Sequence, residues 1–300
     1  MRKKVDVVVI NWNSGILTKN AVDPYLTNPS SRILCNVTVV DNASADGSLA
    51  LLKTLPVKLI INTVNAGFGK ACNQAIEHSA ADYILLLNPD TKSTIAVLET
   101  LVDFLEKNPA YAIAGPQQLD DNGHVVKSCG RFPTFKTSVY ELLGISKIFP
   151  YHFTPAPIMV DFDHLSSRDV DQVMGSYMLI KKSAIDITGF MDDDYFMYAE
   201  DRDLSKRMAD NGFKSYYIAD CRIVHSGGDS GDRIVALRLF YSMSARSIYW
   251  KKHLKSLEYA VLVLMSLAAE PVLRILSSPK KTVAIIKAYW LYLKKLITSK

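Results

Sequence analysis

The chain has 300 residues, of which 49% are hydrophobic and 22% are charged. This composition excludes an intrinsically disordered protein, and the length allows one large domain with an appendage or two small domains. The net charge of +5 is unevenly placed, because residues 246–300 hold 11 lysine and arginine residues but only 2 acidic ones, which gives that segment +9. Such a basic tail is attracted to anionic phospholipid headgroups or to nucleic acid.

Strands and helices are expected to alternate over residues 1–115. Apolar, β-branched runs predict buried strands at Val5–Asn11, Val37–Asp41, Val57–Ile61 and Tyr83–Leu87. The spacing of apolar residues over Thr94–Asn108 predicts a helix, which Pro109 ends. This alternation predicts an α/β, Rossmann-like fold with a mostly parallel sheet flanked by helices. Ligands bind such sheets at the carboxyl ends of the strands.

Polar residues cluster where each of these strands ends. They are Asn11 and Asn13 after the first strand, Asp41 after the second, Asn65 and Gly67 after the third, and Asn88 and Asp90 after the fourth. Any one cluster is also typical of an ordinary turn, because Asn, Asp, Gly and Pro dominate turns. Four clusters on one edge of a sheet favour a binding site.

The chemistry of these residues suits a nucleotide ligand. A carboxylate at a strand end, such as Asp41, can accept hydrogen bonds from a base or a ribose. The glycines of Asn65–Gly69 permit close backbone approach, and the helix that follows favours phosphate at its N-terminus. Asp90 can hold Mg²⁺ or Mn²⁺, and such an ion would neutralise charge on a departing nucleoside diphosphate.

The second half is less regular. Residues 116–170 predict an irregular insertion, regular structure resumes at Val173–Ile180, and a helix is expected from Glu200 to Asn211. Acids in the first turn of that helix are ordinary, yet beside aromatic residues they also suit a general base that faces a sugar. His225 is either structural or a ligand of metal or phosphate.

In their order and spacing these motifs resemble glycosyltransferase family 2, the inverting enzymes with a GT-A fold. The nearest resemblance is to bacterial rhamnosyltransferases that build cell-surface polysaccharides. The matching segments run from Val5 to Ser230 and include Asn11-Trp12-Asn13, Val40-Asp41-Asn42, Asn65-Ala66-Gly67, Asn88-Pro89-Asp90, Tyr198-Ala199-Glu200-Asp201 and His225-Ser226-Gly227-Gly228.

The resemblance implies a role for each matching residue. Asp201 would be the general base, with Glu200 beside it, and Asp90 and His225 would hold the metal. Asp192 and Tyr198 would contact the acceptor. The donor-binding set would be Asn11, Asn13, Asp41, Asn65, Gly67, Asn88, Asp90 and Arg246. For Arg246, contact with the diphosphate competes with a place on a solvent-exposed helix face.

One departure bears on the donor. Asn88 stands where many family members have the first Asp of an Asp-x-Asp motif, so the cation meets less negative charge. Asn-Pro-Asp is similar to rhamnosyltransferase-like members, which implies dTDP-L-rhamnose as the donor and a lipid-linked or polysaccharide acceptor. A UDP-sugar donor and a non-catalytic nucleotide-binding scaffold on the same fold stay open as alternatives.

We expect residues 1–245 to form the catalytic domain, with a nucleotide-sugar half (1–115) and an acceptor half (116–245). Residues 246–300 would form a basic amphipathic tail. Within the tail, Tyr259–Ala269 is too short an apolar run to span a bilayer. Val283–Leu293 combines aromatic residues with flanking lysines, as interfacial helices do. The tail would therefore dock on the cytoplasmic face of the inner membrane, with no nucleic-acid partner. Packing on the catalytic domain as core helices is the alternative.

Overall fold

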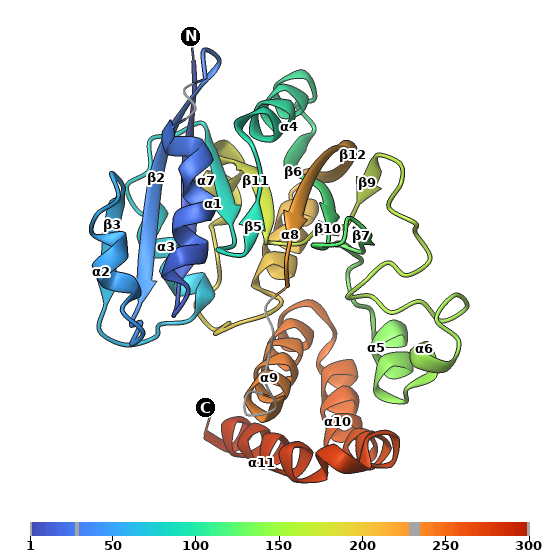
Figure 1. The fold of residues 1–300 in the computed structure, drawn as a ribbon. Coiled ribbons are helices and arrows are strands. Elements are labelled where there is room, and N and C mark those ends of the chain that lie inside the picture. The colour runs from blue at the N-terminus through green and yellow to red at the C-terminus, as the bar shows by residue number, and fades with distance from the viewer. Residues whose placement is uncertain (1, 28–29, 228–234, 299–300) are drawn as a thin grey trace.

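The fold is described from a computed structural model, for residues 2–27, 30–227 and 235–298. It contains a ten-stranded sheet in the order β3-β2-β1-β4-β11-β6-β12-β5, with β7 and β9 at its side (Figure 1). The α/β class predicted from the sequence is confirmed.

The four predicted strands form one end of this sheet. They are β1 (Lys3–Asn11), β2 (Ile33–Asn42), β3 (Lys58–Asn62) and β4 (Tyr83–Leu87), and they pair with one another in parallel. The helices of this half are α1 (Gly15–Thr27), α2 (Ser48–Leu52), α3 (Phe68–Ile76) and α4 (Ile95–Lys107). The carboxyl ends of β1, β2 and β3 therefore meet at one edge, as expected.

The other end of the sheet is mixed. Its strands are β5 (Thr91–Lys92), β6 (Tyr111–Leu119), β11 (Tyr177–Lys181) and β12 (Lys214–His225). β11 is antiparallel to both β4 and β6, whereas β12 is parallel to β6. The mostly parallel order thus holds for β1–β4, and the later strand β11 enters between β4 and β6 from the opposite direction.

The predicted insertion is irregular, with short elements. These are β7 (Val125–Val126), β8 (Cys129–Gly130), α5 (Phe135–Leu142), α6 (Ile145–Ile148), β9 (Arg168–Val170) and β10 (Gln172–Val173). After β11 come α7 (Lys182–Thr188) and α8 (Glu200–Asp210), so the helix expected from Glu200 is confirmed.

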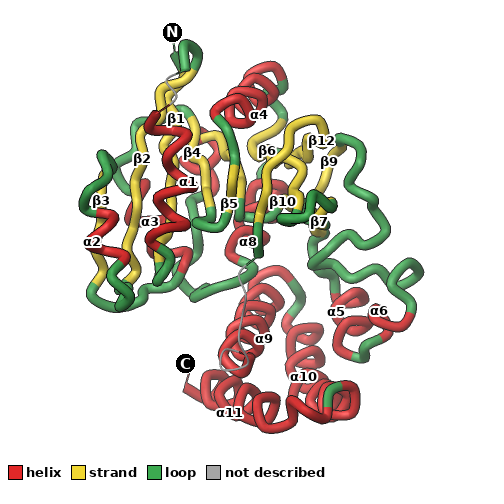
Figure 2. The backbone as a smooth tube through the Cα atoms, in the orientation of Figure 1, coloured by secondary structure: helices red, strands yellow, loops and turns green. Residues whose placement is uncertain are grey.

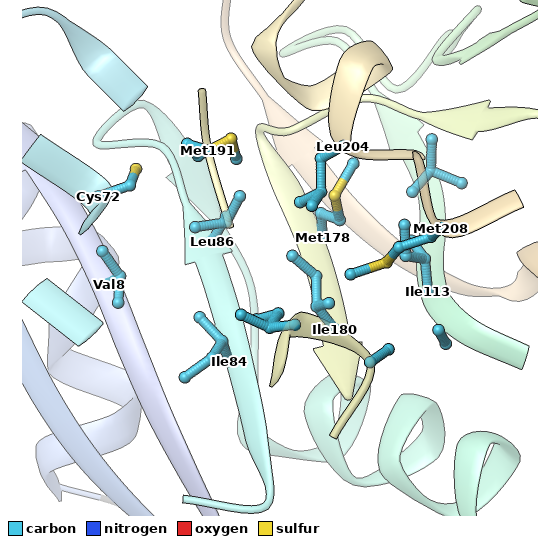
Figure 3. Packing of buried hydrophobic residues seen from close by; sticks show 14 of the residues in the cluster. Val8, Cys72, Ile84, Leu86, Ile113, Met178, Ile180, Met191, Leu204 and Met208 are labelled. Carbon is cyan, nitrogen blue, oxygen red and sulfur yellow. The ribbon is translucent and has the colours of Figure 1, made fainter. Parts of the chain in front are cut away.

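Apolar residues cover both faces of the sheet. Ile84 and Leu86 of β4 point to one face, where they pack with Met178, Ile180 and Leu204 (Figure 3). The alternate residues of β4 pack on the other face against α1 and α4. Burial on both sides is the reason why the strand has a continuous apolar sequence.

The C-terminal part is helical (Figure 2). It consists of α9 (Val235–His253), α10 (Ser256–Ser277), a 3-10 turn at Pro279–Lys281, and α11 (Thr282–Thr298). α9 and α11 share a small core of Met243, Ile285, Ala288, Tyr289 and Tyr292. α9 is continuous across residues 245 and 246, so the expected boundary falls inside a helix.

The helix α10 is longer than the apolar run Tyr259–Ala269 on which the sequence-based expectation rested. It has 22 residues, and by length and composition it could cross a membrane, with 17% of its most apolar window buried. Its inward face bears Leu262, Ser266, Glu270 and Arg274, of which the first three are buried. The opposite, outward face bears Leu264, Ala268, Val272 and Leu276, all exposed. Polar groups inside and apolar groups outside reverse the pattern of a soluble amphipathic helix.

Candidate active site

A buried polar cluster joins the ends of β1 and β2. The Asn11 amide donates to a carboxylate oxygen of Asp41 at 2.7 Å and to the Ser44 hydroxyl at 2.9 Å. The second Asp41 oxygen accepts the Ser44 N–H at 3.1 Å, and the Asn13 side chain accepts the Ala45 N–H at 2.8 Å. The structure thus brings Asn11, Asn13 and Asp41 together, and their hydrogen bonds fix the shape of this loop.

The next loop along the edge is fixed by amides and by a glycine. The Asn42 amide donates to Asn65 at 2.9 Å, and Asn65 accepts the Gly67 N–H at 3.0 Å. Gly67 has a φ of 87°, and a Cβ added there would lie 2.6 Å from the Phe196 carbonyl oxygen. That oxygen accepts the Phe68 N–H at 2.8 Å. Glycine is therefore required where this loop meets the segment before α8.

Asp90 and His225 meet at the far side of the edge. His225 Nε2 lies 3.2 Å from a carboxylate oxygen of Asp90, and both side chains are mostly buried. The Asp90 carbonyl accepts the Ser226 N–H at 3.1 Å, and the Asn88 N–H donates to the Ser176 carbonyl at 2.9 Å. Gly228 and Ser230, which follow in the same motif, lie outside the described residues.

The Asp90–His225 pair fits a divalent cation that receives its other ligands from a substrate. Two ligands at right angles on one Mg²⁺ or Mn²⁺ ion stand about 3 Å apart, close to the observed 3.2 Å. Among the described residues, no group of three or more His, Cys, Asp or Glu side chains could hold a metal. A site with two protein ligands suits an ion that also binds phosphate oxygens.

Two carboxyl groups with different environments begin α8. Asp201 accepts the Gly175 N–H at 2.9 Å and the Arg202 N–H at 2.8 Å, and these two contacts orient its carboxyl group. Glu200 is buried, and one of its oxygens has no hydrogen-bond partner among the described side chains and backbone. Burial, with a smaller effect from the Asp201 charge, raises the pKa of Glu200 to about 8. Glu200 therefore holds a proton at neutral pH and is not available there as a proton acceptor.

The backbone before α8 has an unusual conformation. Tyr198 and Ala199 have φ angles of 71° and 62°, in a region that non-glycine residues rarely adopt. The Tyr198 hydroxyl accepts a hydrogen bond from Arg238 at 3.2 Å. Asp192, the second residue expected at the acceptor, forms an ion pair with Lys252 of α9 at 2.6 Å. Both predicted acceptor residues thus contact α9.

A third acid of α8, Asp203, links α8 to the end of α9. It is fully buried and pairs with Lys252 at 2.6 Å, His253 at 2.8 Å and Arg207 at 2.8 Å. Burial opposes ionisation, but these hydrogen bonds outweigh it and hold the pKa of Asp203 well below its usual range. Asp203 is a structural clamp between α8 and α9, and no local sequence pattern points to its distant partners on α9.

A cavity of about 770 Å³ unites several of these groups. Asn88 and Pro89 line it from the sheet edge, and Glu200 and Asp201 line it from α8. Its other wall comes from the insertion and from α9 and α10. Asp41, Asn65, Asp90 and His225 are outside this lining, so the predicted residues form a cavity group and a neighbouring strand-end group.

Arg246 lines the cavity and is not on a solvent-exposed face. Its guanidinium makes two hydrogen bonds with Glu270 of α10, at 3.1 and 2.6 Å, and lies 4.8 Å from the centre of the Trp250 ring. Arg274 of α10 binds the same carboxylate at 2.6 Å and also lines the cavity. Sequence reasoning missed Glu270 and Arg274. Their spacing of four residues inside an apolar run was the available signal.

Comparisons with known proteins agree with the family resemblance. The model of the family described as "Glycosyl transferase family 2" matches residues 6–170. An N-acetylglucosaminyl-diphospho-decaprenol L-rhamnosyltransferase of Mycobacterium tuberculosis is 28% identical over 218 residues, which cover 68% of this chain and 70% of that protein. The dTDP-rhamnosyl transferase RfbF of Shigella flexneri is 24% identical and covers 83% of this chain and 78% of its own length.

A solved structure agrees with the fold. The mannosyltransferase PcManGT from Pyrobaculum calidifontis, in complex with GDP-Man and Mn²⁺, superposes with a TM-score of 0.57 at 16% identity. The match covers 99% of this chain and 76% of that one. This likeness confirms the expected GT-A fold.

Proposed function

Since this chain belongs to glycosyl transferase family 2 and is a hexosyltransferase, we propose that it transfers L-rhamnose from dTDP-L-rhamnose to a lipid-linked acceptor, with inversion at the anomeric carbon. The observation that carries the proposal is the shared cavity. Asp201 lines it from α8, and Asn88 and Pro89, which directly precede Asp90, line it from the sheet edge.

In the proposed reaction Asp201 removes the proton from an acceptor hydroxyl. The hydroxyl oxygen then attacks the anomeric carbon on the face opposite the leaving nucleoside diphosphate, so the configuration inverts. The two backbone N–H groups that bind Asp201 hold its side chain in one orientation. Glu200 stays protonated beside it, because burial raises its pKa to about 8.

The donor would lie along the strand ends. Asp41, within the cluster of Asn11 and Asn13, would be next to the base or ribose, and the loop at Asn65 and Gly67 would approach the nucleotide through its backbone. Asn88 would lie near the diphosphate. Asp90 and His225 would hold a Mg²⁺ or Mn²⁺ ion, which supplies neutralisation of the charge that develops on the diphosphate.

The choice of sugar and acceptor is supported by relatives and by the outward face of α10. The two relatives are named for rhamnosyl transfer, one with dTDP in its name and one with a diphospho-decaprenol acceptor. The apolar outward residues of α10, together with the lysines of α11, favour peripheral docking on the cytoplasmic face of a bacterial inner membrane. A lipid-linked acceptor is confined to that surface.

The deciding experiment is a panel of sugar nucleotides. We expect dTDP-L-rhamnose with Mg²⁺ or Mn²⁺ to raise the melting temperature of the full chain more than dTDP-glucose, UDP-glucose or GDP-mannose does. A larger shift with a UDP-sugar would overturn the donor assignment. Stabilisation without any turnover on a lipid-linked acceptor would favour a nucleotide-binding scaffold.

A further inference from the structure

The helical wall of the cavity carries more positive than negative charge. Arg246 and Arg274 both line the cavity, and both bind one carboxylate, that of Glu270. A single acid therefore neutralises two guanidinium groups. Glu270 is almost fully buried, and its contacts hold both arginines in place beside the cavity.

Other polar groups close to these two arginines do not neutralise their excess positive charge. Arg202, also in the lining, donates from Nε to the neutral Gln172 side chain at 3.0 Å, and no ion pair involves it within the described ranges. Glu141 of α5 accepts the Ala156 N–H at 2.9 Å. Burial raises the pKa of Glu141, which favours its neutral form. Of the three arginines that line the cavity, Arg246 and Arg274 share the single carboxylate of Glu270, and Arg202 has no ion pair among the described residues. The Nε atom of Arg246 has no hydrogen-bond partner in the described part of the chain.

The same helix that carries Arg274 toward the cavity exposes apolar side chains on its other side. Leu264 and Val272 are 67% and 55% exposed, and Leu276 is 71% exposed. On α11, exposed Ile286 and Trp290 join residues of α10 to line an apolar groove of about 340 Å³. An anion that reached the arginines while attached to a hydrocarbon chain would find a complementary surface for each of its two parts.

We infer that Arg246 and Arg274 bind the phosphate group that joins the acceptor sugar to its lipid. The inference rests on the proposed function, because the acceptor sugar would have to reach Asp201 in the same cavity. It assigns Arg246 to the acceptor and not to the donor diphosphate, since Arg246 belongs to the helical wall with Arg274, whereas Asp90 and His225 lie at the sheet edge. Guanidinium groups suit this role because they bind phosphate oxygens in pairs.

The test uses full-length protein and Arg274→Gln. This variant leaves Glu270 paired with Arg246, so no buried carboxylate loses its last partner. Lys287→Gln, on an exposed position of α11, is the matched control that removes one positive charge away from the cavity. Each protein is titrated with phosphatidylcholine vesicles that contain either a polyprenyl phosphate or phosphatidylglycerol at equal surface charge. Inorganic phosphate and dTDP are titrated separately in solution.

We expect Arg274→Gln to weaken binding to polyprenyl phosphate vesicles by about tenfold, because a hydrogen bond to a charged group is lost. Its binding to phosphatidylglycerol vesicles should match that of Lys287→Gln, and its affinity for dTDP should equal that of the wild type. Equal losses on both kinds of vesicle would overturn the inference. A loss confined to inorganic phosphate would overturn the lipid assignment. Failure of the wild type to bind dTDP would count against the proposed donor instead, and the vesicle comparison would still stand.

Discussion

The sheet part and the helical part place their polar groups in opposite ways. Asparagine, aspartate and serine side chains hydrogen-bond to one another at the ends of β1, β2 and β3, next to an apolar core. In α10 the charged groups Glu270 and Arg274 face inward, and Leu264 and Val272 face outward. The first arrangement suits a polar ligand in water. The second suits an apolar surrounding that ends at a charged cavity. A substrate that is partly sugar and partly lipid needs both arrangements.

The largest effect is expected at the cavity. Asp201→Asn should lower turnover by about 10²–10⁴-fold, because the general base is lost. Donor affinity should remain near that of the wild type. The amide can accept only one of the two backbone N–H groups that Asp201 now binds, so a small drop in melting temperature is also expected. Turnover and dTDP-sugar affinity are measured side by side, and near-normal turnover would remove Asp201 from the role of base.

Asp90→Ala tests the sheet edge. We expect donor affinity in Mg²⁺ or Mn²⁺ to fall by about 100-fold, since a bridging cation contributes several kcal/mol of charge stabilisation. Asp186→Ala removes an exposed carboxylate from α7 and is the control. Calorimetry with and without EDTA gives the answer. Equal donor binding by the wild type in both conditions would contradict the metal role of Asp90 and His225.

The outward face of α10 is tested by Leu264→Gln combined with Val272→Gln. Because each apolar side chain contributes about 1.5 kcal/mol when it leaves water, the double variant should bind anionic vesicles about 100-fold more weakly. The melting temperature in solution should change little, as both side chains are exposed. Ile187→Gln, on the exposed face of α7, should leave vesicle sedimentation unchanged. Equal sedimentation of the double variant would show that α10 does not face the lipid.

The raised pKa of Glu200 predicts that the stability of the protein depends on pH. Its pKa is raised to about 8, so between its ordinary value of 4.5 and pH 8 the native protein holds a proton that the unfolded chain has lost. The free energy of unfolding of the wild type should therefore fall as pH rises through this window, by on the order of a few kcal/mol. Glu200→Gln should lack this decline. Denaturation in urea at several pH values measures it, and parallel curves for the two proteins would disprove the raised pKa.

The smallest effect concerns the loop between β3 and α3. Gly67→Ala should lower the free energy of unfolding by about 1–3 kcal/mol, because its φ is positive and its Cβ would clash with the Phe196 carbonyl. Gly123→Ala is matched, since Gly123 has a similar φ of 82° but nothing within 4 Å. A larger loss for Gly67 than for Gly123 isolates the contact with Phe196, and equal losses would show that only φ matters.

How far the sequence predicted this fold depends on where each residue finds its partners. The strand at Tyr83–Leu87 was predicted with its bounds because burial on both faces leaves a local apolar signature. β6 was not predicted, and its last residues were assigned to the irregular insertion expected from residue 116. They include Gln117 and Gln118. Both are buried, and they donate to the His164 carbonyl at 2.6 Å and the Ser176 hydroxyl at 2.7 Å. Partners so distant in the sequence leave no local pattern.

The candidate site shows the same limit. Asp201, Asp90 and His225 could be singled out because each belongs to a motif at the end of an element. In the structure Asp201 lines the cavity, and Asp90 lies 3.2 Å from His225. Glu270 was taken as the end of an apolar run. In the structure its charge is matched by Arg246, which is 24 residues away on another helix. Only the packing of α9 on α10 makes that match, so the length of α10 could not be judged from apolar residues alone.

The Asp203 clamp has a consequence for substrate choice. Lys252 and His253 at the end of α9 grip a buried carboxylate only two residues after Asp201. These contacts join the end of α9 directly to the helix that carries Asp201. If the helices rest on a bilayer, this connection would hold Asp201, the proposed base, at a fixed height above the lipid. Acceptors would then be sorted by how far their terminal sugar stands from the membrane, as well as by the identity of that sugar.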